Sequence, residues 1–211
     1  MTTESLAFGS LAIAFDHRVL RPREWTVAQS EWAAQILRTA PDGPVLELCS
    51  GAGQIGLLAV AGSGRPLVCV DASDVACEFA RTNALAAGLA EQVDVRHAPL
   101  ESAVGPTEVF ALVIADPPWV PRLDTGRFPE DPLSAIDGGP DGLDVARACL
   151  QVIRRHLAPG GSALLQLGTT EQADVLADEE LHLADALTLS EVRQQERGVL
   201  VRIDRDAASA E

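Results

Sequence analysis

The chain has 211 residues, a length that suits one large domain better than two small ones. Hydrophobic residues make up 47% of it, and no run approaches the roughly 18 apolar residues of a membrane span, so we expect a cytoplasmic protein without a membrane segment or a secretory leader. The formal net charge of −15 disfavours nucleic acid as a partner, because nucleic-acid affinity comes mostly from Lys and Arg on phosphates.

The N-terminal part, residues 1–40, is predicted to be a segment and a helix that pack on the core, and residues 41–205 are predicted to be the main part of a single structural domain. The helix is expected from about residue 25 to residue 38, because apolar residues recur along one face. Its start is marked by Thr26-Val27-Ala28-Gln29, which has the form of a capping box.

From residue 45 onward, short apolar runs alternate with segments of helical period, which predicts parallel strands joined by crossover helices. The strands are expected at residues 45–48, 67–70, 93–96, 110–115 and 163–167. Helices are expected at residues 73–87 and 142–157, the second capped by Asp141 and ended by Pro159-Gly160-Gly161. Residues 186–194 and 199–204 are typical of an antiparallel hairpin at the sheet edge, with a turn at residues 195–198.

A glycine-rich segment, residues 47–56, follows the first of these strands and runs into a helix, with Gly51 and Gly53 where the backbone turns and approaches a ligand. The carboxylate of Glu47 would repel a pyrophosphate but suits a ligand with an ammonium or sulfonium group. Asp71 ends the next strand about 20 residues later, where it can accept hydrogen bonds from ribose hydroxyls. This combination favours a methyl donor over a dinucleotide; the simpler interpretation is that both carboxylates only cap loops.

The strand at residues 110–115 leads directly into Asp116-Pro117-Pro118-Trp119. Parallel strands hold ligands at their carboxyl ends, so these residues are predicted to lie at a site. The Asp116 side chain and the Pro117 carbonyl can accept N–H groups of a planar nitrogen, and Trp119 can stack on the planar group. The alternative is a proline turn in which Asp116 caps the backbone and Trp119 is a core aromatic.

At this point the chain resembles the class I S-adenosylmethionine-dependent methyltransferases, from Val19 to Asp204. The resemblance implies a Rossmann-like, doubly wound α/β fold with a seven-stranded, mostly parallel sheet whose last strand is antiparallel. It implies S-adenosyl-L-methionine as the cofactor and no metal. By position, the residues implied around the donor are Thr26, Glu47, Gly51, Gly53, Ile55, Asp71, Ala72, Leu100 and Asp116.

Two further segments are similar to one subfamily, the release-factor glutamine-N5 methyltransferases of the HemK/PrmC type. Residues 19–26 match its Val-Leu-x-Pro-Arg-x-x-Thr element, and residues 135–144 match its Ala-Leu-x-Gly-Gly-x-Asp-Gly-Leu-Asp segment. That subfamily carries Asn-Pro-Pro-Tyr where this chain has Asp116 and Trp119, and Asp at this position is more typical of adenine-N6 enzymes. The N-terminal helical domain of full-length bacterial members is expected to be absent.

We therefore expect methyl transfer to a planar nitrogen, with Asp116, Pro117 and Trp119 as the catalytic residues. A glutamine side chain of a protein is the first candidate acceptor. A nucleic-acid base of the adenine-N6 type and a small metabolite are alternatives; the base is compatible with the arginines that flank the predicted site, which are Arg18, Arg21, Arg23, Arg122 and Arg127. A fourth interpretation is a partner protein that binds S-adenosylmethionine without catalysis. The oligomeric state is left open.

Overall fold

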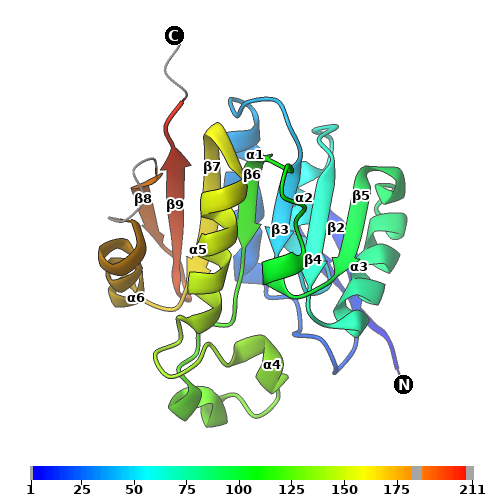
Figure 1. Cartoon of the computed structure of the whole chain (residues 1–211). Coiled ribbons are helices and arrows are strands. Elements are labelled where there is room, and N and C mark those ends of the chain that lie inside the picture. The colour runs from blue at the N-terminus through cyan, green and yellow to red at the C-terminus, as the bar shows by residue number, and fades with distance from the viewer. Residues whose placement is uncertain (1, 182–186, 208–211) are drawn as a thin grey trace.

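A computed structural model describes residues 2–181 and 187–207, and its centre is a seven-stranded sheet in the order β5-β4-β3-β6-β7-β9-β8 (Figure 1). The strands are β3 Val45–Leu48, β4 Leu67–Asp71, β5 Val93–His97, β6 Phe110–Ala115, β7 Leu157–Leu167, β8 Leu187–Gln194 and β9 Val199–Arg205. All pairs are parallel except those that β9 makes with β7 and β8. The predicted fold and the edge hairpin are confirmed; position 186 lies outside the described residues.

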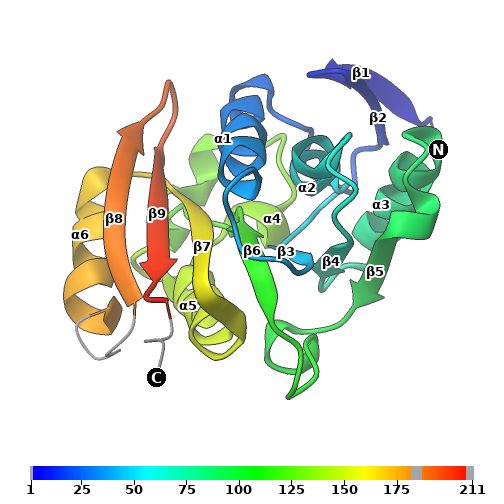
Figure 2. The same cartoon turned by 90° about the horizontal axis from the view of Figure 1, so that it is seen from above.

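Helices cover both faces of the sheet, which is why its middle strands β3 and β6 are buried throughout and, apart from Glu47, apolar (Figure 2). On one face lie α1 Val27–Leu37, α2 Gln54–Val60 and α3 Asp74–Ala86. On the other face lie α5 Asp144–His156 and α6 Thr170–Leu176. Among the helices of the described ranges, none is both long and apolar enough to cross a bilayer.

The start of α1 differs from the prediction, because the capping box is not formed. A 3-10 turn, Glu24–Thr26, precedes the helix, and the Thr26 hydroxyl donates to the Arg23 carbonyl at 2.7 Å. Gln29 is fully buried, and its side-chain amide donates to the carbonyl of Ala115 at 3.0 Å. A tertiary contact thus replaces the local cap and ties α1 to the end of β6.

Both ends of the helix predicted at residues 142–157 also differ from the prediction. Helix α5 begins at Asp144, since the Asp141 carboxylate accepts from the Leu143 amide at 3.0 Å and the chain turns there before the helix starts. Residues 159–161 do not end the helix in a free turn but belong to β7, whose pairing with β6 shifts register at this point. The proline and glycines are accommodated by that irregularity.

An N-terminal hairpin, β1 Glu4–Phe8 and β2 Leu11–Phe15, was not predicted. It packs outside α3, where the buried Asn83 side chain accepts from the Ala14 amide at 2.8 Å and donates to the Ala14 carbonyl at 3.0 Å. The side-chain amide of Asn83 also donates to the carbonyl of Ala52 in the glycine-rich loop at 2.9 Å. One side chain therefore joins the hairpin, α3 and the loop.

Asn83→Ala should remove these three hydrogen bonds and lower the free energy of unfolding by about 2 kcal/mol, because buried backbone groups lose their partners. The measurement is urea unfolding followed by circular dichroism, with hydrogen exchange of the Ala14 amide as the local readout. Thr82→Ala is the control, since the exposed Thr82 hydroxyl bonds only within α3. Equal stability of the two variants would contradict this role for Asn83.

Candidate functional site

The carboxyl ends of β3, β4 and β6 meet at one edge of the sheet, the lower edge in Figure 1, and two cavities open there. The larger, of about 430 Å³, is called the loop cavity, and its lining includes Arg18, Cys49, Gly51, Gln54, Asp71, Ala72, Leu100, Ser134 and Val145. The smaller, of about 80 Å³, is called the tryptophan cavity, and its lining includes Arg23, Trp25, Pro117, Trp119, Phe128, Asp131 and Arg197. Leu20, Asp116, Pro118 and Ala135 line both.

The glycine-rich loop presents its backbone to the loop cavity. Gly51 and Gly53 have φ values of 53° and 79°, in the left-handed region that glycine adopts without strain. Cys49 also lies there, with φ 56°, although it carries a side chain. The Gly51 amide donates to the Asp71 carboxylate at 2.8 Å, so the loop and the end of β4 are fixed to each other.

Asp71 lies where the sequence predicts it, at the end of β4 and on the loop cavity. Its second oxygen accepts from the Ser73 amide at 2.9 Å. Burial raises the pKa of Asp71, and the Ser73 and Gly51 amides oppose that shift. A carboxylate has about four lone-pair positions, so the backbone amides leave capacity to accept from a ligand hydroxyl.

Glu47 does not lie on either cavity. It is 2% exposed, and its carboxylate accepts from the Gly56 amide at 2.9 Å and from the Cys69 thiol at 3.3 Å. A β-carbon at position 56 would collide with this carboxylate, so the close approach needs glycine. Burial raises the pKa of Glu47 to about 7. In the structure, Glu47 anchors the start of α2 to β3.

Of the residues predicted around the donor, the structure brings five together on the loop cavity: Gly51, Asp71, Ala72, Leu100 and Asp116. The other four, Thr26, Glu47, Gly53 and Ile55, are not among the residues that line it. Lining residues that sequence reasoning missed include Cys49 and Gln54, which lie inside the glycine-rich segment but are not glycines, and Ser134 and Val145, which lie on either side of the segment at residues 135–144.

Asp116 stands where the two cavities meet, at the end of the fully buried β6. Its carboxylate has no hydrogen-bond partner among residues 2–181 and 187–207. Burial between apolar walls raises its pKa to about 7. Pro117 and Trp119 line the tryptophan cavity, as their predicted role as an acceptor clamp requires.

The segment at residues 135–144 packs against the backbone of the Asp116-Pro117-Pro118-Trp119 motif. A β-carbon on Gly138 would lie 2.7 Å from the Pro118 carbonyl oxygen, so the backbones can approach this closely only at glycine. The Gln172 side chain donates to the carbonyl of Trp119 at 3.0 Å and to that of Asp141 at 3.0 Å. The segment therefore has a structural role in holding the Asp116 motif.

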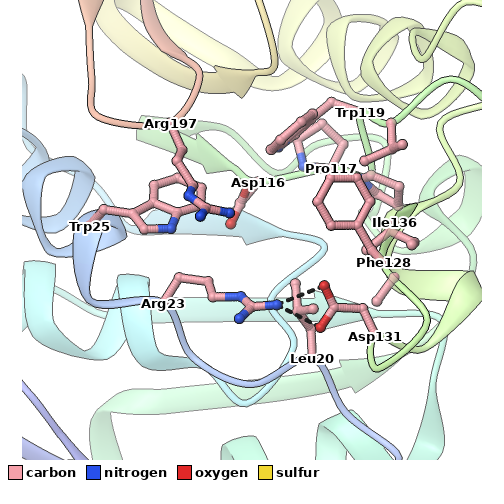
Figure 3. Close-up of a pocket in the computed structure, with 13 residues that line it drawn as sticks. Leu20, Arg23, Trp25, Asp116, Pro117, Trp119, Phe128, Asp131, Ile136 and Arg197 are labelled. Atoms are coloured by element: carbon pink, nitrogen blue, oxygen red, sulfur yellow. Dashed lines mark hydrogen bonds and ion pairs between the residues drawn. The ribbon is translucent and has the colours of Figure 1, made fainter. Parts of the chain in front are cut away.

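The tryptophan cavity is walled by two loops that an ion pair joins (Figure 3). Arg23 donates to both carboxylate oxygens of Asp131, at 2.5 and 2.6 Å, across 108 positions of the chain. The Asp131 side chain is only 7% exposed, so the carboxylate of this pair is largely desolvated. Phe128 forms part of the same wall. No local sequence signal marks Phe128, Asp131 or Arg197 as site residues.

The Methyltransferase small domain model matches residues 28–128. The chain is 35% identical over 167 residues to a release factor glutamine methyltransferase from Gloeobacter violaceus, covering 74% of this chain and 57% of that protein. A protein of the same description from Xylella fastidiosa is 30% identical, covering 94% and 72%. A ribosomal protein uL3 glutamine methyltransferase from Burkholderia pseudomallei is 31% identical, covering 77% and 57%. The chain spans about three fifths of the length of the first of these relatives.

Among solved structures, the human METTL16 catalytic domain in complex with a MAT2A 3′UTR hairpin superposes with a TM-score of 0.74. The sequences are 15% identical, and the match covers 95% of this chain and 76% of that one. At this identity the likeness shows the shared fold alone.

The buried Glu47 carboxyl predicts a pH-dependent loss of stability. A carboxyl whose pKa is raised from 4.5 to about 7 on folding stabilises the protein at low pH, and that contribution is lost as pH rises from about 4.5 to 7. Glu47→Gln should therefore gain roughly 2 to 3 kcal/mol relative to the parent chain between pH 5 and pH 8. Thermal unfolding at both pH values measures this, with the exposed Glu78→Gln as control. Identical pH dependence of Glu47→Gln and the parent chain would contradict the assignment.

Proposed function

Because the chain belongs to the class I S-adenosylmethionine-dependent methyltransferases, close to the HemK-type glutamine methyltransferases, we propose that it methylates the side-chain nitrogen of a glutamine in a protein. The observation that carries the proposal is the position of Asp116. Its carboxylate, which no residue in the described part of the chain pairs, stands between a cavity large enough for a cofactor and a small cavity walled by aromatic rings.

The loop cavity fits the cofactor that the family uses. Its volume of about 430 Å³ lies in the range of small-molecule sites. Asp71 has lone pairs left for ribose hydroxyls, the backbone at Gly51 faces the cavity, and Leu100 offers an apolar surface for a base. When bound, S-adenosylmethionine supplies a methyl group on a positively charged sulfur, which the carboxylates of Asp71 and Asp116 suit in charge.

At the acceptor side, the ionised Asp116 carboxylate and the Pro117 carbonyl accept the N–H groups of the carboxamide, which turns its nitrogen toward the methyl group. Trp119 holds the flat group between itself and the opposite wall. Held beside Asp71 and Gly51, the donor would supply its methyl group to the acceptor nitrogen and would keep the electron pair of the broken sulfur–carbon bond. The nitrogen then loses its proton to water.

The size of the tryptophan cavity favours a carboxamide over a purine. A space of about 80 Å³ admits only a few water molecules, which is closer to the end of a glutamine side chain than to a fused double ring. The net charge of −15 also disfavours a polyanion. The second candidate, an adenine-type base, is favoured by Asp116, which replaces the Asn of the glutamine enzymes.

The deciding experiment uses labelled S-adenosylmethionine with three acceptors: release factor, ribosomal protein uL3 and fractionated extract, all from the organism that encodes this chain. The first two are the proteins that the relatives' descriptions name. We expect label in protein, on glutamine, by mass spectrometry of peptides. If label enters only RNA, DNA or small molecules, the acceptor is not a protein glutamine. If the donor binds but no methyl group is transferred, the chain is a non-catalytic donor-binding protein.

Asp116→Ala should lower the turnover number at least about 100-fold, because the acceptor nitrogen loses its orientation, while donor affinity stays nearly unchanged. Asp71→Ala should instead weaken donor binding about tenfold or more, through lost hydrogen bonds to a charged group. Calorimetry with the donor and initial rates separate the two effects. Asp174→Ala, on the exposed side of α6, is the control. Full activity of Asp116→Ala on the true acceptor would disprove its role.

The pH dependence of the rate follows from the same residue. The pKa of Asp116 is about 7, so the carboxylate that accepts N–H groups predominates only above that value, and the rate at limiting acceptor should rise between pH 6 and pH 8. Asp116→Asn, which restores the residue of the glutamine enzymes, should keep part of the activity but lose this rise. A rise of the same midpoint in Asp116→Asn would show that another group controls it.

A further inference from the structure

The tryptophan cavity contains a guanidinium that the proposed function does not use, that of Arg197. This residue lies in the turn between β8 and β9, and its side chain points from that turn into the cavity, toward Asp116 and beside Trp25 (Figure 3). In that view it lies on the side of the cavity opposite Phe128. A cation and a carboxylate thus face the same small space.

The turn that carries Arg197 is fixed at the rim of the cavity. The Gln195 amide donates to the Gly198 carbonyl at 3.0 Å, which closes the turn. Gly198 has φ 78°, and a β-carbon there would collide with the carbonyl of Leu167. The side-chain amide of Gln166, 1% exposed, donates to the Arg197 carbonyl at 3.5 Å. The backbone of Arg197 is therefore held while its side chain remains in the open space of the cavity.

The other charges around the cavity are already compensated. Arg23 is neutralised by Asp131 through two hydrogen bonds. For the side chain of Arg197, no hydrogen bond or ion pair is found within the described ranges 2–181 and 187–207. Asp116 likewise has no partner there. The cavity is therefore lined by one acceptor group, that of Asp116, and one donor group, that of the exposed Arg197, which no described residue pairs.

We propose that Arg197 is an acceptor-binding residue whose guanidinium donates to the carbonyl oxygen of the carboxamide, while Asp116 accepts from its N–H group. This inference rests on the proposed function and deepens it, because it states which side of the acceptor each charged group holds. A carboxamide is a planar group with donors at one end and an acceptor oxygen at the other. An aliphatic amine lacks that oxygen and leaves the guanidinium unmatched. An aminopurine offers a ring nitrogen as the acceptor in place of that oxygen, and the test below distinguishes it from a carboxamide.

The test measures binding without turnover. The enzyme is saturated with S-adenosylhomocysteine and titrated with N-acetylglutamine methylamide or with adenosine, and binding is followed by NMR of the Trp25 and Trp119 indole N–H groups. Arg197→Ala should bind the glutamine probe at least about tenfold more weakly, the effect of one hydrogen bond from a charged donor. Arg197→Lys should retain part of the affinity. Affinity for S-adenosylhomocysteine should be unchanged in both.

Two matched controls isolate the guanidinium. Glu196→Ala changes the neighbouring exposed residue of the same turn, and Arg127→Ala removes an exposed positive charge that does not line the cavity. Both should bind the probe as the parent chain does. Parental affinity in Arg197→Ala, absence of probe binding by the parent chain, or preference for adenosine would each overturn the inference. Failure of the proposed function is distinct, since it would leave probe binding intact while no acceptor takes up label.

Discussion

The burial of β6 on both faces is the constraint on which the site depends. Because α1 and α5 cover this strand, its polar continuation can only emerge at the edge of the sheet, and Asp116 does so with little solvent and no partner among the described residues. A carboxylate placed there has a raised pKa and an unmet capacity to accept hydrogen bonds. A ligand with N–H groups can donate the hydrogen bonds that this carboxylate lacks. The chemistry of the site thus follows from how the helices cover the core.

Neutral amide side chains hold the loops around that carboxylate. Gln29, Asn83 and Gln166 are each 1% exposed or less. Gln29 donates to a carbonyl at the end of β6, and Asn83 donates to one in the glycine-rich loop. Gln166 donates to a carbonyl in the β8–β9 turn, and Gln172 donates to one in the Asp116 motif. An amide can do this without bringing a charge into the interior. The loops around the carboxylates are thereby fixed by neutral groups.

The sequence predicted what local patterns determine. Apolar runs located the strands, and the Asp116 motif was correctly expected at the carboxyl end of a strand, where it lines a cavity. The capping box at Thr26 failed because Gln29 makes a tertiary contact in its place. Glu47 was expected beside the ligand, yet its side chain is buried and accepts from the Gly56 amide of α2. Arg23 and Asp131 meet across 108 positions, a contact that no local spacing encodes.

The direction of β9 has its own consequence for the site. Val199, at the start of β9, pairs with Leu167, at the end of β7, so the chain reversal between β8 and β9 falls on the same edge as Asp116. Were β9 parallel to its neighbours, its entry would lie at the opposite edge, far from both cavities. The one strand that departs from the parallel pattern is thus what delivers an arginine from the end of the chain to a site built by its middle.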